Sequence, residues 1–358
     1  MSDAFVKALS TWKETGVPSN PEGWIVTAAR NSILDCFRHV KVQSRSVETI
    51  LNKIENSPSE LPDQRLSLMF ACTHPALAPE IRTPLMLQTV LGMSIEQISS
   101  AFLISPSALE KRLVRAKKKI KEAGIPFEVP EKRELPERLD DVLETIYAAY
   151  GTSWNEFHDL LEDEAIFLGR LVVELLPEAP EAKGLLSLML FCSSRKNSRR
   201  VEGMFIPLDQ QNPQDWNQSF ISEAETILKA ASEKRSIGAF QLEAAIQSAH
   251  VARLSGGVNS QSEILSLYRA LITLYPSSAA WISYASAFLS FGLPAEAEKI
   301  LKSLNHESLS NYQPYWVLKG EVHLALGEEE RGKHALQTAL GLSPDPAVAK
   351  FLRKRLSR

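Results

Sequence analysis

Residues 93–127, MSIEQISSAFLISPSALEKRLVRAKKKIKEAGIPF, predict two short helices joined by a tight turn. Ser94 is expected to cap the first helix, and Gln97, three residues later, completes a capping box with it. Ser105 is expected to cap the second helix. Pro106 suits the first position of that helix, because the missing N–H of proline is harmless there. The segment therefore has the outline of a helix-turn-helix.

The second helix has two contrasting faces. Its buried stripe is predicted from apolar residues at spacings of four, three and four: Leu109, Leu113, Ala116 and Ile120. The side chains expected on the opposite face are Ser107, Lys111, Arg115 and Lys118. Seven of the eleven residues at positions 111–121 are Lys or Arg, which suits a helix that offers its exposed side to base edges and phosphates. A solvated basic helix that never touches DNA is the alternative.

Composition places the chain among ordinary water-soluble proteins. At 358 residues it is long enough for two or three domains. Cys36, Cys72 and Cys192 lie far apart, without the paired spacing of a zinc site or the even count of a disulfide framework. No membrane-spanning run and no secretory leader are found, so we expect a cytoplasmic protein.

Charge is unevenly distributed along the chain. Residues 1–127 hold 16 Lys and Arg against 12 Asp and Glu, whereas the remainder holds 24 against 31. The front is therefore mildly basic and the rear acidic, which would let the rear lie against the front.

Further helices are predicted on both sides of the helix-turn-helix. In front of it, Asn20 and Pro21 open a helix that extends to about position 40, and two more are expected at residues 61–73 and 84–91, with Gly92 ending the last. Behind it, helices are expected at residues 138–150, 165–176 and 181–192, the last almost wholly apolar and central to a core. The fold class is therefore predicted to be all-α.

The rear of the chain contains a repeat. The residues that recur 35 positions later are Ala285, Leu289, Gly292, Ala297 and Leu301, matched by Gly320, Leu324, Gly327, Gly332 and Leu336. This offset is close to the tetratricopeptide period, and small residues stand where paired helices must approach closely. Stacked hairpins of this type usually form a surface for a protein or peptide ligand. A packed scaffold without a ligand is the alternative.

Several of these segments together resemble a known family. LMFACTHPALAPE and RLVRAKKKIKEAGIPF resemble the promoter-reading C-terminal domain of extracytoplasmic-function sigma factors, of the subgroup with a large tetratricopeptide-like helical extension. NPEGWIVTAARNSILDCFRH resembles the N-terminal sigma domain of that subgroup, and LLPEAPEAKGLLSLMLF its helical extension. Helices that precede the segment DAFVKALSTW in the family are missing here, so we expect a truncated N-terminal sigma domain.

The resemblance implies a domain order and a set of DNA contacts. The expected parts are residues 1–45 as a truncated N-terminal sigma domain that reads the minus-ten element, 46–60 as a linker, 61–127 as the four-helix promoter-binding domain, 128–136 as a second linker, 137–238 as the helical extension and 239–358 as tetratricopeptide-like repeats. Major-groove contacts are expected from Ser107, Lys111, Arg112 and Arg115, and phosphate contacts from Lys117, Lys118, Lys119 and Lys121. Minus-ten contacts are expected from Arg30, Asn31, Arg38 and His39.

Two residue groups could suggest an enzyme. His158 and Asp159 with Glu162 have helical spacing, but no second ligand pair is seen, and an exposed polar face explains them better. Cys72 and His74 are nearly adjacent, which seldom gives nucleophile–base geometry, so a buried thiol at a helix end is the preferred interpretation. We expect no enzymatic activity, no cofactor and no metal.

The sequence thus supports two hypotheses of different classes. The first is a sigma factor that binds promoter DNA and core RNA polymerase and carries a regulatory helical extension. The second is a tetratricopeptide-like interaction scaffold, or a regulator, with a DNA-binding remnant that does not support initiation. Binding to core polymerase distinguishes them.

Overall fold

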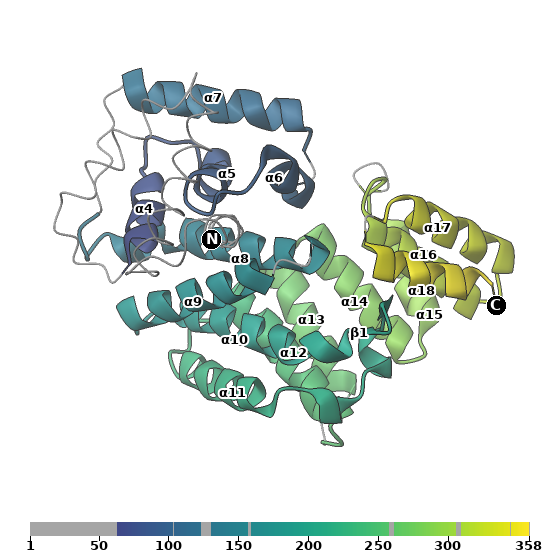
Figure 1. The fold of residues 1–358 in the computed structure, drawn as a ribbon. Coiled ribbons are helices and arrows are strands. Elements are labelled where there is room, and N and C mark those ends of the chain that lie inside the picture. Colours follow the sequence, from purple (N-terminus) through teal and green to yellow (C-terminus); the bar gives the residue numbers. More distant parts are fainter. Residues whose placement is uncertain are drawn as a thin grey trace, which may run out of the picture. The chain divides into compact units, whose positions relative to one another are not determined.

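The computed structural model describes residues 63–102, 104–122, 130–156, 159–257, 261–305, 309–343 and 345–357. This part of the chain is almost entirely helical (Figure 1), so the predicted all-α class is confirmed. Its only strands are the short antiparallel pair β1 (Arg200–Val201) and β2 (Met204–Phe205). The chain divides into two units, Met1–Glu60 with Val114–Val129, and Leu61–Leu113 with Pro130–Arg358.

Four helices form the first described region: α4 (Gln64–Cys72), α5 (Pro79–Thr89), α6 (Ile95–Phe102) and α7 (Pro106–Glu122). The Asp63 carboxylate caps α4 by accepting the backbone N–H of Arg65 at 2.7 Å. The helix expected at residues 84–91 begins instead at Pro79, which takes the first-turn position, and Pro84 lies inside it. Gly92 follows α5 with a φ of +67°, a left-handed conformation that favours glycine.

Helix α8 (Leu135–Glu156) packs against α4, α5 and α6. It contains the helix expected at residues 138–150, and its stripe of Leu139, Val142, Leu143 and Ile146 is buried. Thr145 on α8 donates its hydroxyl to the Met86 sulfur at 3.7 Å. Part of the α8 surface therefore completes the core of the preceding helices.

Two ion pairs connect the same elements. Arg82 Nη1 on α5 lies 2.8 Å from Asp141 Oδ2 on α8, and both side chains are less than one-fifth exposed. Arg65 on α4 pairs with Glu164 on α9 (Asp159–Leu175). Helices α4 and α5 are thus joined by charge as well as by apolar packing to the segment that follows.

Helix α10 (Pro180–Ser194) is the centre of the next layer. Twelve of its fifteen residues are buried, which confirms the prediction of a core helix. It packs between α9, α11 (Gln218–Ser232) and α12 (Ala239–Leu254). Tyr150 on α8 donates to the Met189 carbonyl of α10 at 3.0 Å.

The segment between α10 and α11 contains the 3₁₀ helices η1 (Lys196–Ser198), η2 (Leu208–Gln210) and η3 (Pro213–Asp215), with the β1–β2 pair after η1. Arg200 Nη2 lies 2.7 Å from Asp345 Oδ2, in front of α18 (Pro346–Leu356). The rings of Phe205 and Phe351 meet edge to face, with centroids 5.9 Å apart. The strand pair is thereby attached to the last helix of the chain.

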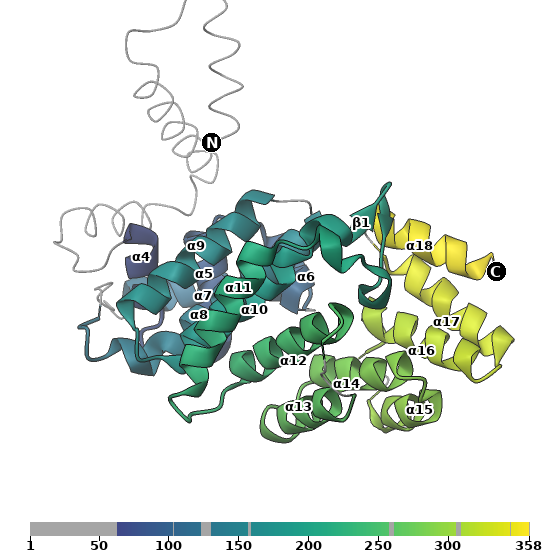
Figure 2. The same cartoon turned by 90° about the horizontal axis from the view of Figure 1, so that it is seen from below.

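Helices α12 to α17 follow one another as pairs, α12 with α13 (Gln261–Leu274), α14 (Ser278–Ser290) with α15 (Pro294–Ser303), and α16 (Gln313–Ala325) with α17 (Glu329–Gly341), as Figure 2 shows. A Cβ added at Gly332 would lie 2.7 Å from the Leu324 side chain, and one at Gly320 would lie 2.7 Å from Leu336. The prediction that these glycines stand where paired helices approach closely is confirmed.

Candidate nucleic-acid interface

The helix-turn-helix is built by the caps that the sequence predicts. The Ser94 N–H donates to Gln97 Oε1 at 2.8 Å, and the Gln97 N–H donates to Ser94 Oγ at 3.2 Å, which completes the capping box in front of α6. The Ala108 N–H donates to Ser105 Oγ at 3.4 Å, and Pro106 is the first residue of α7. These local bonds fix where each helix begins.

The apolar stripe of α7 is buried as predicted. Leu109 is fully buried, Leu113 is 2% exposed, and Ala116 and Ile120 remain below 10%. On α6, Ile98 is fully buried, whereas Phe102 is 37% exposed. Burying these side chains anchors α7, and its opposite side is left to solvent.

The exposed face of α7 carries most of the predicted DNA contacts. Exposed positions are Ser107, Lys111, Arg112, Arg115, Lys118, Lys119 and Lys121. At about 100° per residue, Ser107, Lys111, Arg115 and Lys118 fall within an arc of roughly 80° opposite the buried stripe. Lys118 Nζ lies 3.6 Å from Glu122, and both side chains are more than 60% exposed, so that pairing is weak.

Lys117 occupies a different environment from the other basic residues. It lies closer to the buried stripe, it is half-buried, and burial lowers the pKa of its ammonium. A side chain in this position can still reach along the edge of the helix to a phosphate, since lysine keeps its charged end in water while its stem packs. Lys117 therefore does not lie at the centre of the exposed face of α7.

The predicted minus-ten residues Arg30, Asn31, Arg38 and His39 lie outside the described residues. The described interface therefore consists of the exposed face of α7. Sequence patterns did not identify the ion pair of Arg82 with Asp141, which joins α5 to α8, because the two residues are 59 positions apart.

Of the two residue groups that could suggest an enzyme, the structure describes Cys72 and Glu162 in full. Burial raises the pKa of the Cys72 thiol to about 12, so this cysteine is a poor nucleophile, and the interpretation as a buried thiol is confirmed. The interpretation of Glu162 as part of an exposed face is wrong. Glu162 is 6% exposed, accepts the Ser193 hydroxyl at 2.5 Å, and pairs with Lys196 Nζ at 3.2 Å. His158 lies outside the described residues.

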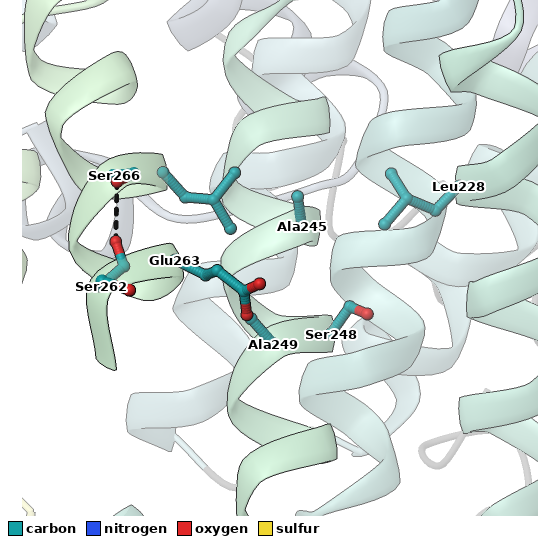
Figure 3. A pocket seen from close by; sticks show the side chains of 8 residues that line it. Leu228, Ala245, Ser248, Ala249, Ser262, Glu263 and Ser266 are labelled. Carbon is teal, nitrogen blue, oxygen red and sulfur yellow. Dashed lines mark hydrogen bonds between the residues drawn. The ribbon is translucent and has the colours of Figure 1, made fainter. Parts of the chain in front are cut away.

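A second surface feature lies between α11, α12 and α13. It is a hollow of about 530 Å³. The side chains that line it, drawn in Figure 3, are small or apolar apart from one carboxylate: Leu228, Ala245, Ser248, Ala249, Ser262, Glu263, Ser266 and Leu267. An adjoining hollow of about 900 Å³ shares Leu228 and Ala245 and extends to Ile237, which is 62% exposed. Small side chains leave the helix surfaces open here, so an apolar side chain of a partner would fit.

None of the described helices is long and apolar enough to cross a lipid bilayer.

Comparisons with known proteins identify two parts of the chain. Residues 67–120, which include α5, α6 and most of α7, match sigma-70 region 4. Residues 138–232 match a family of unknown function, DUF6596. A sigma-70 region 4 implies binding to promoter DNA and association with RNA polymerase, which agrees with the exposed basic face of α7.

The whole chain also has a relative. An uncharacterised protein of Rhizobium meliloti (strain 1021) is 33% identical over 375 aligned positions, which cover 99% of this chain and 88% of the relative. The similarity extends through the helix-turn-helix and the rear helices alike. The chain therefore belongs to the same family as this Rhizobium meliloti protein, and it carries a sigma-70 region 4 followed by a DUF6596 domain.

Proposed function

We propose that the protein is a sigma factor of the extracytoplasmic-function type, which directs core RNA polymerase to a dedicated set of promoters in the cytoplasm. The observation that carries this proposal is the α7 surface: a capped helix with one side buried and an arc of Ser107, Lys111, Arg115 and Lys118 on the other, within a match to sigma-70 region 4.

The proposed roles follow from position along α7. Ser107, Lys111, Arg112 and Arg115 lie within the first ten residues of the helix. The N-terminal part of the second helix is the part that enters the major groove in a helix-turn-helix. Lys117, Lys118, Lys119 and Lys121 lie on the last turns and would follow the phosphates. Residues 1–45 would read the minus-ten element through Arg30, Asn31, Arg38 and His39.

The helical extension is proposed to regulate this activity. The contact that supports regulation is α8 on α5, where Asp141 pairs with Arg82 and Thr145 bonds to Met86. Movement of α8 would therefore be transmitted to α5, which lies in the same sigma-70 region 4 match as most of α7. The alternating pairs α12 to α17 are proposed to be tetratricopeptide-like repeats, with a protein or peptide ligand in the hollow around Ala245.

A point substitution tests regulation without removing the extension. We expect Asp141→Ala to weaken the α5–α8 contact and to change promoter-directed transcription at least several-fold, since it leaves the partly buried Arg82 unpaired. Glu137→Ala, an exposed carboxylate on the same helix, is the matched control. Equal transcription from the two variants would count against regulation through this contact.

Core polymerase binding separates the sigma factor from its alternative. We expect the full chain to form a stable complex with purified core polymerase, and the complex to retain DNA fragments selected from a random promoter pool. DNA binding without polymerase binding would favour the interaction scaffold with a DNA-binding remnant.

A further inference from the structure

Three ligand-type side chains meet on three consecutive helical elements near the end of the chain. Glu298 comes from α15, His323 from α16, and Glu328 is the residue that precedes α17. One ligand atom from each lies within 4.8 Å of the other two. Ligands around a single ion of bond length about 2.0–2.2 Å are separated by comparable distances.

His323 is the buried member of this group. It is 9% exposed, and its Nδ1 lies 2.7 Å from Glu328 Oε2. An imidazole nitrogen is the commonest metal ligand in proteins. The contact with Glu328 therefore places two potential ligands side by side.

The carboxylates are less exposed than the cations that pair with them. Glu298 is 20% exposed and Glu328 is 36% exposed, whereas their partners Lys302 and Arg331 are 68% and 71% exposed. Ion pairs with such exposed side chains are weak. Both long side chains can swing into water and leave the two carboxylates available.

We propose that Glu298, His323 and Glu328 bind a divalent transition-metal ion, with Zn²⁺ as the first candidate. Two carboxylates and one imidazole form a donor set that suits Zn²⁺, and an imidazole is a poor ligand for the hard cations Mg²⁺ and Ca²⁺. Glu298 and His323 line a hollow of about 350 Å³, which leaves room for water or an added ligand beside them. Trp316 and His334 line the same hollow.

The ion would connect α15, α16 and the start of α17. Apart from this group, the α14–α15 and α16–α17 pairs meet through apolar contacts such as Ile282, Leu301 and Val322. A metal bound by residues on both pairs stabilises the folded repeats, because the unfolded chain does not hold the three ligands together. The site would therefore make the rigidity of this region depend on metal.

Calorimetric titration of the untagged, chelator-treated full chain with ZnCl₂ tests the site. We expect one saturable equivalent that requires His323 and raises the melting temperature, with no comparable response to MgCl₂. His323→Ala and Glu298→Gln should each lower the affinity by at least about tenfold. His334→Ala, a histidine of the same hollow outside the group, is the matched control and should bind as the wild type does.

Lys302→Met gives a test that misfolding cannot imitate. Because it releases Glu298 from its ion pair, it should tighten Zn²⁺ binding several-fold. Circular dichroism confirms that each variant is folded. The proposal is overturned if Zn²⁺ does not bind, or if it binds equally to the His323→Ala and His334→Ala proteins, which would place an adventitious ion on other histidines or cysteines. Neither outcome depends on sigma-factor activity.

Discussion

Arg115 and Lys118 lie on the same exposed face of α7 and allow base reading to be separated from phosphate binding. Arg115→Ala should cost roughly 1–3 kcal/mol on a selected promoter element and little on random DNA, because an arginine that bonds to a guanine edge discriminates sequence. Lys118→Ala should weaken both complexes alike and reduce the slope of log K against log salt concentration by about one. Fluorescence anisotropy at several salt concentrations measures both.

Lys132→Ala, an exposed basic residue outside α7, serves as the control for that comparison. An equal loss from Arg115→Ala on selected and random DNA would make Arg115 a phosphate contact, and the base-reading role assigned to it would be wrong.

Glu243 should make the stability of the folded protein depend on pH. It lies on α12, accepts the Tyr147 hydroxyl at 3.3 Å, and burial raises its pKa from an ordinary value near 4.5 to about 7. Between these values the folded chain holds a proton that the unfolded chain has lost, so this residue's contribution to stability falls as the pH rises. Glu243→Gln should therefore increase the melting temperature more at pH 8 than at pH 5.

His250 makes an opposite contribution, because burial lowers its pKa to about 4 and stability from this group rises with pH. The difference between wild type and Glu243→Gln at each pH removes that common term. Glu233→Gln, an exposed carboxylate, should show no such trend. A difference that does not grow with pH would mean that Glu243 is ionised in the folded protein throughout this range.

Glu162 shows why some side chains cannot be interpreted from local sequence. Its spacing from residues 158 and 159 indicated an exposed polar face, but the Ser193 hydroxyl that binds it is 31 residues away on α10. Caps behave differently: the partners of Ser94 and Ser105 are three residues distant, and the sequence predicted both. Prediction succeeds where the partner is local.

Among the helices, α7 was predicted well and α5 less so. The stripe on α7 follows from helical periodicity alone, and Leu109 and Leu113 are buried accordingly. The start of α5 was expected at Pro84, but Pro79 takes the first-turn position and Pro84 is tolerated inside the helix. Two prolines five residues apart cannot be ranked by local preference.

The α16–α17 pair offers a test of close helix packing. Gly332→Ala should destabilise the protein by about 1–3 kcal/mol, because the added Cβ would meet the Leu324 side chain at 2.7 Å. Gly341→Ala on the same helix has no atom within 4 Å of its added Cβ, and it should be neutral or slightly stabilising. Thermal unfolding measures both. Equal melting temperatures for the two variants would contradict the tight contact.

Taken as a whole molecule, the chain links its sigma-70 region 4 segment to its DUF6596 segment through side chains that sequence patterns do not connect. Helix existence and the all-α class follow from periodicity, whereas the pairing of Arg82 with Asp141 depends on how α8 folds back on α5. The group of Glu298, His323 and Glu328 was equally invisible, since its members come from three elements with no motif spacing.

Promoter-directed transcription by purified core polymerase tests the central claim most directly. With a template selected for binding, the full chain should produce a run-off transcript from a fixed start, and the Lys111→Ala/Arg115→Ala variant should lose most of it while Lys132→Ala retains it. A transcript that is absent with the wild-type chain, or equally strong with the α7 variant, would contradict a sigma factor that reads its promoter through the exposed face of α7.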